Sequence, residues 1–433
     1  MSGKKKLAFY SILESGHLNL CSSIGSILLN KYSNDVEIYF FTDQLWAEKL
    51  SKRDSRFKFE IFGYETKEQE NLIEIMINAM ESIINLPEID RVKAMVSFFN
   101  NPSEFAYIDQ EVSKLIKKLK PDYLLCDLIG VMPSIIENKI PYSFIISGNP
   151  LVLDIEKFPV MGLGLGVNEK EKIKAVRTEL KESFEQIRKN LYKIYDLRKI
   201  IFDSKYPINV PRSDHLSIYC YPKELDYFND DLKKEYKLLQ VDSPVVSSKI
   251  PLPFELPKKF SELPGKIIYV SLGSIFSCYF TKLQKLLDTL ATLPYKYIVS
   301  KGPYGDKITF PDNRFIGENF VNQLAILQVV DMIIAHGGNN TFTECFYFGV
   351  PALIFPILGD QPNNAKRIEE TGYGYQMDLM NYTQEELKEK IEKVFSSETL
   401  IEKNKKVGER IRKDDSLDKA VEIFYSYFNQ IID

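Results

Sequence analysis

The sequence has little of several residue types on which particular kinds of protein depend. Its five cysteines are scattered over 433 residues, are odd in number and form no C-x-x-C pair. That pattern argues against a disulfide framework and against a zinc site. No run of about 18 apolar residues occurs, so no membrane-spanning helix is predicted. These absences favour a reducing compartment, and we expect the protein in the cytoplasm.

Basic and acidic residues are nearly balanced in number. The 56 Lys and Arg residues are interspersed with 60 Asp and Glu residues, and the net charge is −4. No basic face for nucleic acid is therefore expected. The first residues, MSGKKKLAFYSILESGH, are basic, but the apolar part is brief and ends at Glu14 without a small-residue cleavage site. This start is typical of a first β-strand rather than a signal peptide, and we expect no membrane anchor.

Short apolar runs of strand length alternate with amphipathic segments of helix length. This alternation predicts an α/β fold with parallel sheets covered by helices, and the chain length favours two large domains. In the first half we predict strands at Leu7–Leu13, Val36–Phe41, Tyr123–Cys126 and Ser143–Ile146. In the second half we predict strands at Ile267–Ser271, Tyr297–Ser300, Met332–Ala335 and Ala352–Phe355.

A proline-rich stretch at residues 243–265 interrupts the alternation and predicts a linker between the two domains. We therefore predict an N-terminal domain at 1–242 and a C-terminal domain at 266–413. The charged region 168–199 has helical spacing and is interpreted as a solvated helical excursion. A last helix at 414–433 carries an apolar stripe that should pack back on the N-terminal domain, formed by Leu417, Val421, Phe424 and Phe428.

The segment MIIAHGGNNTFTE combines a buried strand, a glycine turn and a helix. The strand ends at His336, Gly337 and Gly338 permit a tight turn, and the helix should begin near Asn340 or Thr341. Backbone N–H groups at a helix start bind anions, so the segment predicts a phosphate site. Two structural alternatives stay open: Thr341 and Glu344 can form a capping box, and His336 can be a core histidine.

A second turn near the start of the chain carries another histidine. His17 follows the first predicted strand in SGHLN, and Asp127 ends the strand in PDYLLCD, so both side chains are expected at the same edge of the first sheet. A histidine can take a proton at neutral pH, and a carboxylate on its other ring nitrogen fixes the tautomer. Asp127 can instead cap the following turn. His215 matches no motif and is interpreted as structural.

The C-terminal segment resembles the donor-binding signature of the family 1 glycosyltransferases, the UDP-glycosyltransferases. Their pattern runs H-x-G-x-N-[ST]-x-x-E, then G-[VT]-P, then [DE]-Q. The matching residues here are His336, Gly338, Asn340, Thr341, Glu344, Gly349, Pro351, Asp360 and Gln361. The resemblance implies the GT-B fold, with two Rossmann-like domains facing each other across a cleft. The lack of leader and anchor resembles the soluble bacterial-type members that are also found in mites.

The resemblance also implies a role for each matching residue. His336 should contact the α-phosphate, Asn340 and Thr341 the diphosphate, Glu344 the ribose, and Asp360 with Gln361 the sugar hydroxyls. Ser274, in VSLGS, matches the position that touches the β-phosphate. The segment FVNQ stands in place of W-x-P-Q, so Phe320, Val321 and Gln323 should contact the nucleoside, with Phe320 in the tryptophan position and Asn322 in the proline position.

The activity implied by the resemblance is an inverting, metal-independent transfer of a sugar, with glucose favoured, from a UDP-sugar to an acceptor hydroxyl activated by His17 and Asp127. The UDP-sugar is a co-substrate, and no cofactor is expected. We predict a lipophilic, often phenolic acceptor of the detoxification kind, bound in the N-terminal domain by an apolar wall of Phe98, Phe99, Met132, Phe158 and Met161. An inactive nucleotide-sugar-binding homologue and a GT-B sugar-nucleotide epimerase remain alternatives. A nicotinamide oxidoreductase is disfavoured, because GLGLG at 162–166 follows no clear strand.

Overall fold

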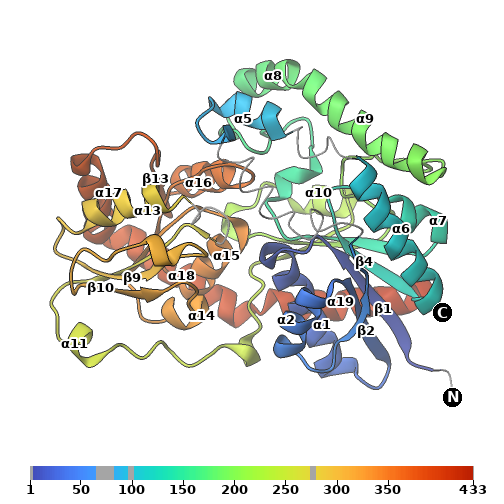
Figure 1. Ribbon diagram of the computed structural model, residues 1–433, viewed down its shortest axis with the longest axis horizontal. Helices are drawn as coiled ribbons and strands as arrows, with labels where there is room; N and C mark the ends of the chain where they lie inside the picture. The colour runs from blue at the N-terminus through green and yellow to red at the C-terminus, as the bar shows by residue number, and fades with distance from the viewer. Residues whose placement is uncertain (1–2, 65–81, 96–101, 274–278, 433) are drawn as a thin grey trace. The chain divides into compact units, whose positions relative to one another are not determined.

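The computed structural model describes residues 3–64, 82–95, 102–273 and 279–432. The chain divides into two compact units. The first unit comprises residues 1–160, 167–246 and 416–433, and the second comprises residues 161–166 and 247–415. Each unit contains a parallel sheet with helices on both faces (Figure 1). None of the helices in the described ranges has the length and apolar character needed to cross a bilayer.

Among its described residues, the first unit has a seven-stranded sheet in the order β3-β2-β1-β4-β5-β6-β7. The strands are β1 (Lys5–Ser11), β2 (Val36–Thr42), β3 (Lys58–Ile61), β4 (Tyr123–Asp127), β5 (Tyr142–Ile146), β6 (Ser217–Cys220) and β7 (Leu238–Val241). The helices are α1 (Ser15–Tyr32), α2 (Gln44–Arg53), α5 (Glu88–Ala94), α6 (Pro102–Leu119), α7 (Pro133–Asn138), η2 (Pro150–Leu153), α8 (Lys170–Glu179), α9 (Lys181–Arg198), η3 (Lys223–Leu225), α10 (Asp230–Glu235) and α19 (Ser416–Ile432).

The second unit has a six-stranded sheet in its described part, in the order β10-β9-β8-β11-β12-β13. The strands are β8 (Ile267–Ser271), β9 (Lys296–Ser300), β10 (Phe315–Glu318), β11 (Met332–Ala335), β12 (Ala352–Ile354) and β13 (Gly374–Gln376). The helices are η4 (Ser247–Lys249), α11 (Lys258–Ser261), α13 (Phe280–Leu290), η5 (Gly305–Lys307), α14 (Gln323–Ile326), α15 (Asn339–Phe348), α16 (Gln361–Glu370), α17 (Gln384–Ser396) and α18 (Glu398–Asp414).

The predicted strands are all present, with ends shifted by at most two residues. Five further strands were not predicted from the sequence: β3, β6, β7, β10 and β13. These strands have three or four residues each, and β3, β7, β10 and β13 lie at sheet edges where each strand is only partly buried. A short edge strand buries few side chains and so leaves a weak hydrophobic pattern.

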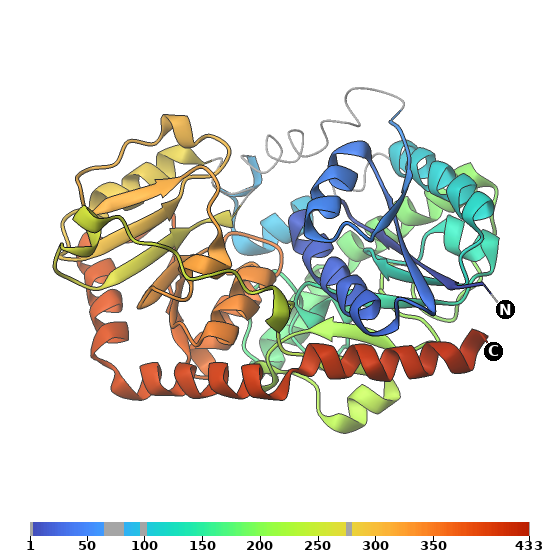
Figure 2. The same ribbon diagram turned by 90° about the horizontal axis from the view of Figure 1, so that it is seen from below.

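The last helix belongs to the first unit. In α19 the stripe Leu417, Val421, Phe424 and Phe428 is buried in one core cluster with apolar residues of α1, β1 and β2. Figure 2 shows α19, in red, running along the helices and strands of that unit. Tyr32 of α1 and Tyr425 of α19 stack with their ring centroids 3.6 Å apart.

The charged region 168–199 is helical as expected, but it is not wholly solvated. In α9, Leu191, Ile194 and Tyr195 pack in a cluster with Ala106 of α6. Arg198 at the end of α9 bonds Asp109 of α6 at 2.9 Å, where the carboxylate is fully buried. Apolar residues spaced three and four apart give α9 one inner face despite its many charges.

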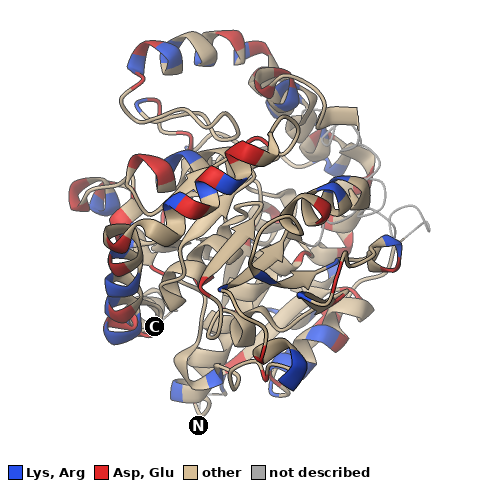
Figure 3. Ribbon diagram, turned by 90° about the vertical axis from the view of Figure 1, so that its left-hand side faces the viewer, with Lys and Arg blue, Asp and Glu red and all other residues tan. Residues whose placement is uncertain are grey.

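The surface charges are mixed over the described residues. Lys and Arg residues alternate with Asp and Glu residues along the helices in Figure 3. Many of these charges pair on the same helix, as Lys393 does with Glu389 at 2.7 Å. The four described cysteines, Cys21, Cys126, Cys220 and Cys345, are buried free thiols. Burial raises the pKa of the Cys126 thiol, which keeps it protonated.

Candidate functional site

His17 and Asp127 meet at the carboxyl edge of the first sheet. His17 is the third residue of α1, and Asp127 is the last residue of β4, which pairs with β1 so that Ser11 lies opposite Asp127. The Nδ1 atom of His17 lies 3.0 Å from Oδ1 of Asp127. The strand order changes direction between β1 and β4, and such a switch point is where open α/β sheets bind ligands.

The burial of the pair is uneven. The Asp127 side chain is 6% exposed, whereas that of His17 is 27% exposed. A buried ionised carboxylate only accepts hydrogen bonds, so it favours a proton on Nδ1 of His17 and leaves Nε2 as the basic nitrogen. The arrangement can therefore remove a proton from a bound hydroxyl group.

Ser147 is a third member of this cluster and was not predicted from the sequence. Its Oγ lies 3.0 Å from the same Nδ1 atom of His17. Ser147 is the first residue after β5, which pairs with β4, and it is 5% exposed. The signal in the sequence was a polar residue directly after a predicted buried strand, at the sheet edge already expected to carry Asp127.

In the second unit, the strand, glycine turn and helix are formed as expected. β11 ends at Ala335, Gly337 adopts a φ of 86°, and Gly338 is the N-cap of α15. The helix begins at Asn339, slightly earlier than predicted, so Thr341 is its third residue and not its cap. The capping-box interpretation of Thr341 and Glu344 is therefore wrong, because no side chain caps α15.

His336 is packed between two glycines. A Cβ atom on Gly273 would lie 2.6 Å from Cε1 of His336, and one on Gly338 would lie 2.5 Å from Nε2. The backbone can approach the imidazole ring this closely only without side chains. Burial lowers the pKa of His336 to about 4, against a hydrogen bond with the Ser271 backbone that raises it. The ring is therefore neutral near pH 7 and can act as an uncharged donor.

Gln323 links a residue expected to hold the ribose, Glu344, to one expected to hold the diphosphate, Thr341. Its Nε2 donates to Oε2 of Glu344 at 2.5 Å and to Oγ1 of Thr341 at 3.2 Å, while its Oε1 accepts from the Tyr269 hydroxyl at 3.1 Å. Glu344 is only 7% exposed, and the hydrogen bond from the Gln323 amide orients its carboxylate. The network fixes Thr341 and Glu344 on the first turns of α15.

The turn before α16 carries Asp360 and Gln361. Oε1 of Gln361 accepts from the N–H groups of Ile357 and Leu358 at 3.0 and 3.3 Å, which orders the loop after β12. That use of Oε1 leaves the Nε2 group of Gln361 as the donor for a ligand. Asn364 donates from Nδ2 to the Gly337 carbonyl at 2.8 Å, so α16 is tied to the turn at His336.

Phe320 is 65% exposed, which is unusual for an aromatic side chain of its size. Val321 follows it in the loop before α14. Asn322 is the N-cap of α14, and its Oδ1 accepts from the Ala325 N–H at 3.3 Å. The asparagine thus has a local reason to stand in the proline position of the motif. Ser274 lies outside the described residues.

The residues predicted to form the acceptor wall are not gathered in one place by the described contacts. Phe98 and Phe99 lie outside the described residues. Met132 packs against the cluster of α6 and α9, and Phe158 packs against the rings of Tyr227 and Phe228. Met161 belongs to the second unit. An acceptor role for each of these residues stays a prediction.

The glycine segment 162–166 also lies in the second unit and in no strand or helix. The Gly162 N–H donates to Oδ1 of Asn363 on α16 at 2.6 Å. A dinucleotide fingerprint joins a strand to a helix, and this segment does not.

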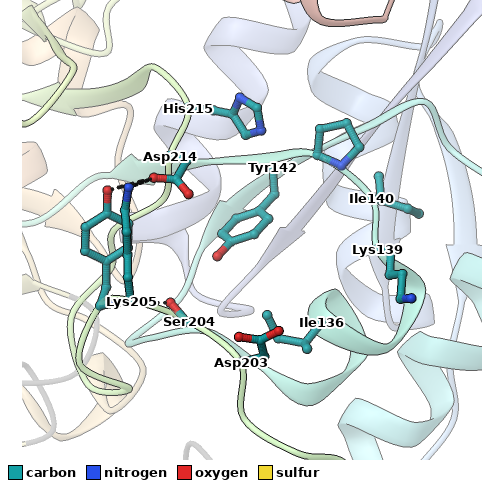
Figure 4. A pocket seen from close by; sticks show the side chains of 11 residues that line it. Ile136, Lys139, Ile140, Tyr142, Asp203, Ser204, Lys205, Asp214 and His215 are labelled. Atoms are coloured by element: carbon teal, nitrogen blue, oxygen red, sulfur yellow. Dashed lines mark hydrogen bonds and ion pairs between the residues drawn. The ribbon is translucent and has the colours of Figure 1, made fainter.

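A hollow of about 460 Å³ lies at the opposite edge of the first sheet, where β5 begins (Figure 4). The Tyr142 ring forms part of its wall, and Asp214 accepts a hydrogen bond from the Tyr206 hydroxyl at 3.1 Å. His215 at its rim bonds the Tyr427 hydroxyl at 2.9 Å through Nδ1, in line with a structural role. Ligands bind at the carboxyl ends of parallel strands, so this hollow is distinct from the His17 cluster.

Comparison with known proteins extends the match beyond the motif. Residues 310–419 match the model of the glycosyltransferase family 28 C-terminal domain. An uncharacterized UDP-glucosyltransferase of Bacillus subtilis, YdhE, is 23% identical over 319 residues, which cover 72% of this chain and 75% of YdhE. Both matches agree with the resemblance of the sequence to the family 1 UDP-glycosyltransferases.

Solved structures with the same fold cover nearly the whole length of the chain. The glycosyltransferase of kitacinnamycin has a TM-score of 0.71 at 15% identity, with 98% of this chain and 99% of that chain covered. Os79 from O. sativa, solved in complex with UDP, has a TM-score of 0.67 at 14% identity, with 98% and 100% covered. The GT-B fold expected from the sequence is confirmed.

Other relatives are matched over a smaller part of the chain. A second uncharacterized UDP-glucosyltransferase of Bacillus subtilis, YojK, is 28% identical over 159 residues, which are 36% of this chain and 39% of YojK. A sterol 3-beta-glucosyltransferase of Pichia angusta is 27% identical over 231 residues, which are 50% of this chain and 18% of the yeast protein. The chain thus spans well under half the length of these two relatives.

Proposed function

We propose that the protein is an inverting glycosyltransferase that moves a sugar from a UDP-sugar to the hydroxyl group of a small lipophilic acceptor. The observation that carries the proposal is the 3.0 Å contact between His17 Nδ1 and Asp127 Oδ1 at the switch point of the first sheet. A nucleotide-binding protein without transferase activity has no need of a base held in this way.

In the proposed reaction, Nε2 of His17 accepts the proton of the acceptor hydroxyl. The hydroxyl oxygen forms a bond to the anomeric carbon while the bond from that carbon to the phosphate oxygen breaks. UDP leaves with the electron pair of the broken bond, and the anomeric configuration inverts. Asp127 stabilises the imidazolium that forms, and the base accounts for roughly 10² to 10⁴ in rate.

The second unit would bind the nucleotide and stabilise the charge of the departing diphosphate. The switch point of its sheet lies between β8 and β11, where Gly273 and His336 lie together. The N–H groups at the start of α15 and the neutral His336 ring are preorganised donors, and losing one such donor typically costs about 3 to 4 kcal/mol at most. These protein groups support a reaction that needs no metal ion.

The donor sugar is proposed to be glucose. Asp360 and Gln361 lie side by side at the start of α16, and Oε1 of Gln361 is engaged by the loop backbone. The pair therefore offers a carboxylate acceptor and an amide donor, which suits two neighbouring sugar hydroxyls. The UDP-glucosyltransferase relatives agree with this choice. A phenolic acceptor is proposed from the family resemblance.

The proposal is tested first by nucleotide binding and then by turnover. Thermal unfolding of the purified protein is followed with UDP, TDP, UDP-glucose, UDP-galactose, UDP-N-acetylglucosamine and NAD(H), each with and without EDTA. A ligand at 100 times its dissociation constant adds about 2.7 kcal/mol of stability. We expect the uridine nucleotides to stabilise the protein equally with and without EDTA.

Turnover is then measured with the stabilising UDP-sugar and a panel of phenols, and products are detected by mass spectrometry. A glycosylated phenol and released UDP support the proposal. Stabilisation by UDP-sugar without transfer to any acceptor hydroxyl would favour an inactive homologue, and conversion of the UDP-sugar to an epimer would favour an epimerase.

A further inference from the structure

The two polar contacts on one nitrogen of His17 carry an inference that rests on the proposed function. Nδ1 lies 3.0 Å from Oδ1 of Asp127 and 3.0 Å from Oγ of Ser147. The two partners come from neighbouring strands, Asp127 from the end of β4 and Ser147 from the residue after β5. We propose that Ser147 is a positioning residue that, together with Asp127, fixes the ring of His17 for proton removal.

The chemistry of the three groups decides the direction of the hydrogen bonds. An ionised carboxylate can only accept, so the proton shared with Asp127 lies on Nδ1 of His17. The Ser147 oxygen then accepts from the same N–H, as in a three-centre bond. If Ser147 instead donated to a bare Nδ1, the ring proton would lie on Nε2 and the ring could not serve as base. The carboxylate of Asp127 and the oxygen of Ser147 therefore both favour a proton on Nδ1 of His17.

Two hydrogen-bond acceptors restrict the orientation of the His17 ring more than one acceptor does. A single contact at Nδ1 lets the imidazole turn about its Cβ–Cγ bond while it keeps one hydrogen bond, because that torsion is broad. A second acceptor from another strand restricts the ring plane and therefore the direction of Nε2.

The surroundings of Asp127 support this role. Its Oδ2 atom is buried and has no hydrogen-bond partner among the described residues. No second donor therefore fixes the orientation of the Asp127 carboxylate at that oxygen. Ser147 is 5% exposed and is therefore held by the packing after β5. An acceptor whose own position is fixed can orient the ring that it contacts.

The experiment replaces Ser147 by alanine and uses Ser143→Ala as the matched control. Ser143 lies on β5, the strand that leads to Ser147, is fully buried and hydrogen-bonds with the Tyr123 hydroxyl at 2.8 Å. Both changes delete one buried serine hydroxyl. Ser147→Thr restores a hydroxyl and serves as the rescue variant.

The first measurement needs no substrate. The chain has three histidines, so the ring ¹⁵N and Cε1–H resonances can be assigned by single replacements, with His17→Gln identifying that of His17. We expect Ser147→Ala to move the ring ¹⁵N shifts of His17 toward more of the tautomer protonated on Nε2 and to lower its titration midpoint. Ser143→Ala should leave both unchanged, and Ser147→Thr should restore both.

The second measurement is turnover with the donor and acceptor found for the wild type. We expect Ser147→Ala to lower kcat about three- to tenfold, the value of one hydrogen bond, with KM for both substrates unchanged and activity regained in Ser147→Thr. Wild-type ¹⁵N shifts and titration in folded Ser147→Ala would overturn the inference. Failure of the proposed function is seen separately, as a lack of transfer by the wild type, because the NMR result is independent of turnover.

Discussion

A Cβ atom on Gly338 would lie 2.5 Å from Nε2 of His336, so the imidazole ring rests directly against the backbone that starts α15. Gly338 has a φ of −60°, which any residue can adopt. The requirement for glycine at this position is therefore steric and comes from the histidine. A ring held against the helix start is placed to donate to the same anion as the helix amides.

Gly338→Ala should displace His336 and weaken UDP binding by about tenfold or more, because a crowded site must shift its neighbours at a cost of about 1 to 3 kcal/mol. Gly63→Ala is the control, since a Cβ there meets nothing within 4 Å. Titration calorimetry with UDP measures both. Equal affinity of Gly338→Ala and wild type would show that the ring does not contact the nucleotide.

His17→Ala should lower kcat about 10²- to 10⁴-fold and leave UDP binding intact, because the nucleotide is proposed to bind to the second unit. Asp127→Asn should also lower kcat, since an amide can favour the wrong tautomer of His17. His215→Ala, whose ring bonds Tyr427, should keep its turnover. Unchanged turnover in His17→Ala would disprove the base assignment.

Phe320→Ala should weaken UDP binding about fivefold or more, because stacking on a base is worth about 1 to 3 kcal/mol, and Phe320→Trp should strengthen it. Stability should not change, since Phe320 is 65% exposed. The control is Leu252→Ala, in which the replaced apolar side chain is 87% exposed. Fluorescence or calorimetric titration decides, and identical UDP affinities in all variants would mean that the ring does not stack.

Gln323→Leu should destabilise the second unit by about 1 to 3 kcal/mol and reduce UDP affinity, because it removes the partners of the Glu344 carboxylate and the Tyr269 hydroxyl. Gln376→Leu removes a similar bond, to Glu369 at 2.9 Å, on the edge strand β13. It should keep UDP affinity. Urea unfolding and UDP titration of both variants separate the two effects, and normal UDP binding in Gln323→Leu would contradict the role of the network.

His336 should make stability fall as the pH is lowered. Its pKa is about 4 in the folded protein and about 6.5 when exposed, because burial disfavours the charged ring. The unfolded chain therefore binds the proton more readily. The neutral ring contributes about 3 kcal/mol to the free energy of unfolding. This contribution is fully present above pH 6.5 and is lost as the pH falls toward 4.

Urea unfolding at pH 7.5 and pH 5.0 tests this prediction in the wild type and in His336→Asn. The variant should lose less stability between the two pH values. His215 has its pKa lowered by burial as well, so His215→Asn is measured alongside to separate its share. An NMR titration of His336 near pH 6.5 would contradict the burial argument.

The long elements and the two turns could be predicted because each leaves a local signal. Buried strands such as Ile267–Ser271 and Met332–Ala335 are continuous apolar runs, and the glycines after His336 mark a turn. The start of α15 was misplaced because Thr341 and Glu344 imitate a capping box. Their side chains are engaged by Gln323, which is 18 and 21 residues away in sequence.

Local sequence patterns were enough to predict the α/β class, the strand-turn-helix at His336 and the shared sheet edge of His17 and Asp127, because apolar periodicity and turn residues are local properties. Two contacts became visible only in the folded chain: Ser147 contacts the same His17 nitrogen as Asp127, and Gly273 lies against His336. The apolar stripe of α19 predicted its packing on the first unit, but only the tertiary structure showed that Tyr425 of α19 stacks on Tyr32 of α1. These contacts join residues far apart in the chain, and their distances depend on strand order and packing, which no local pattern encodes.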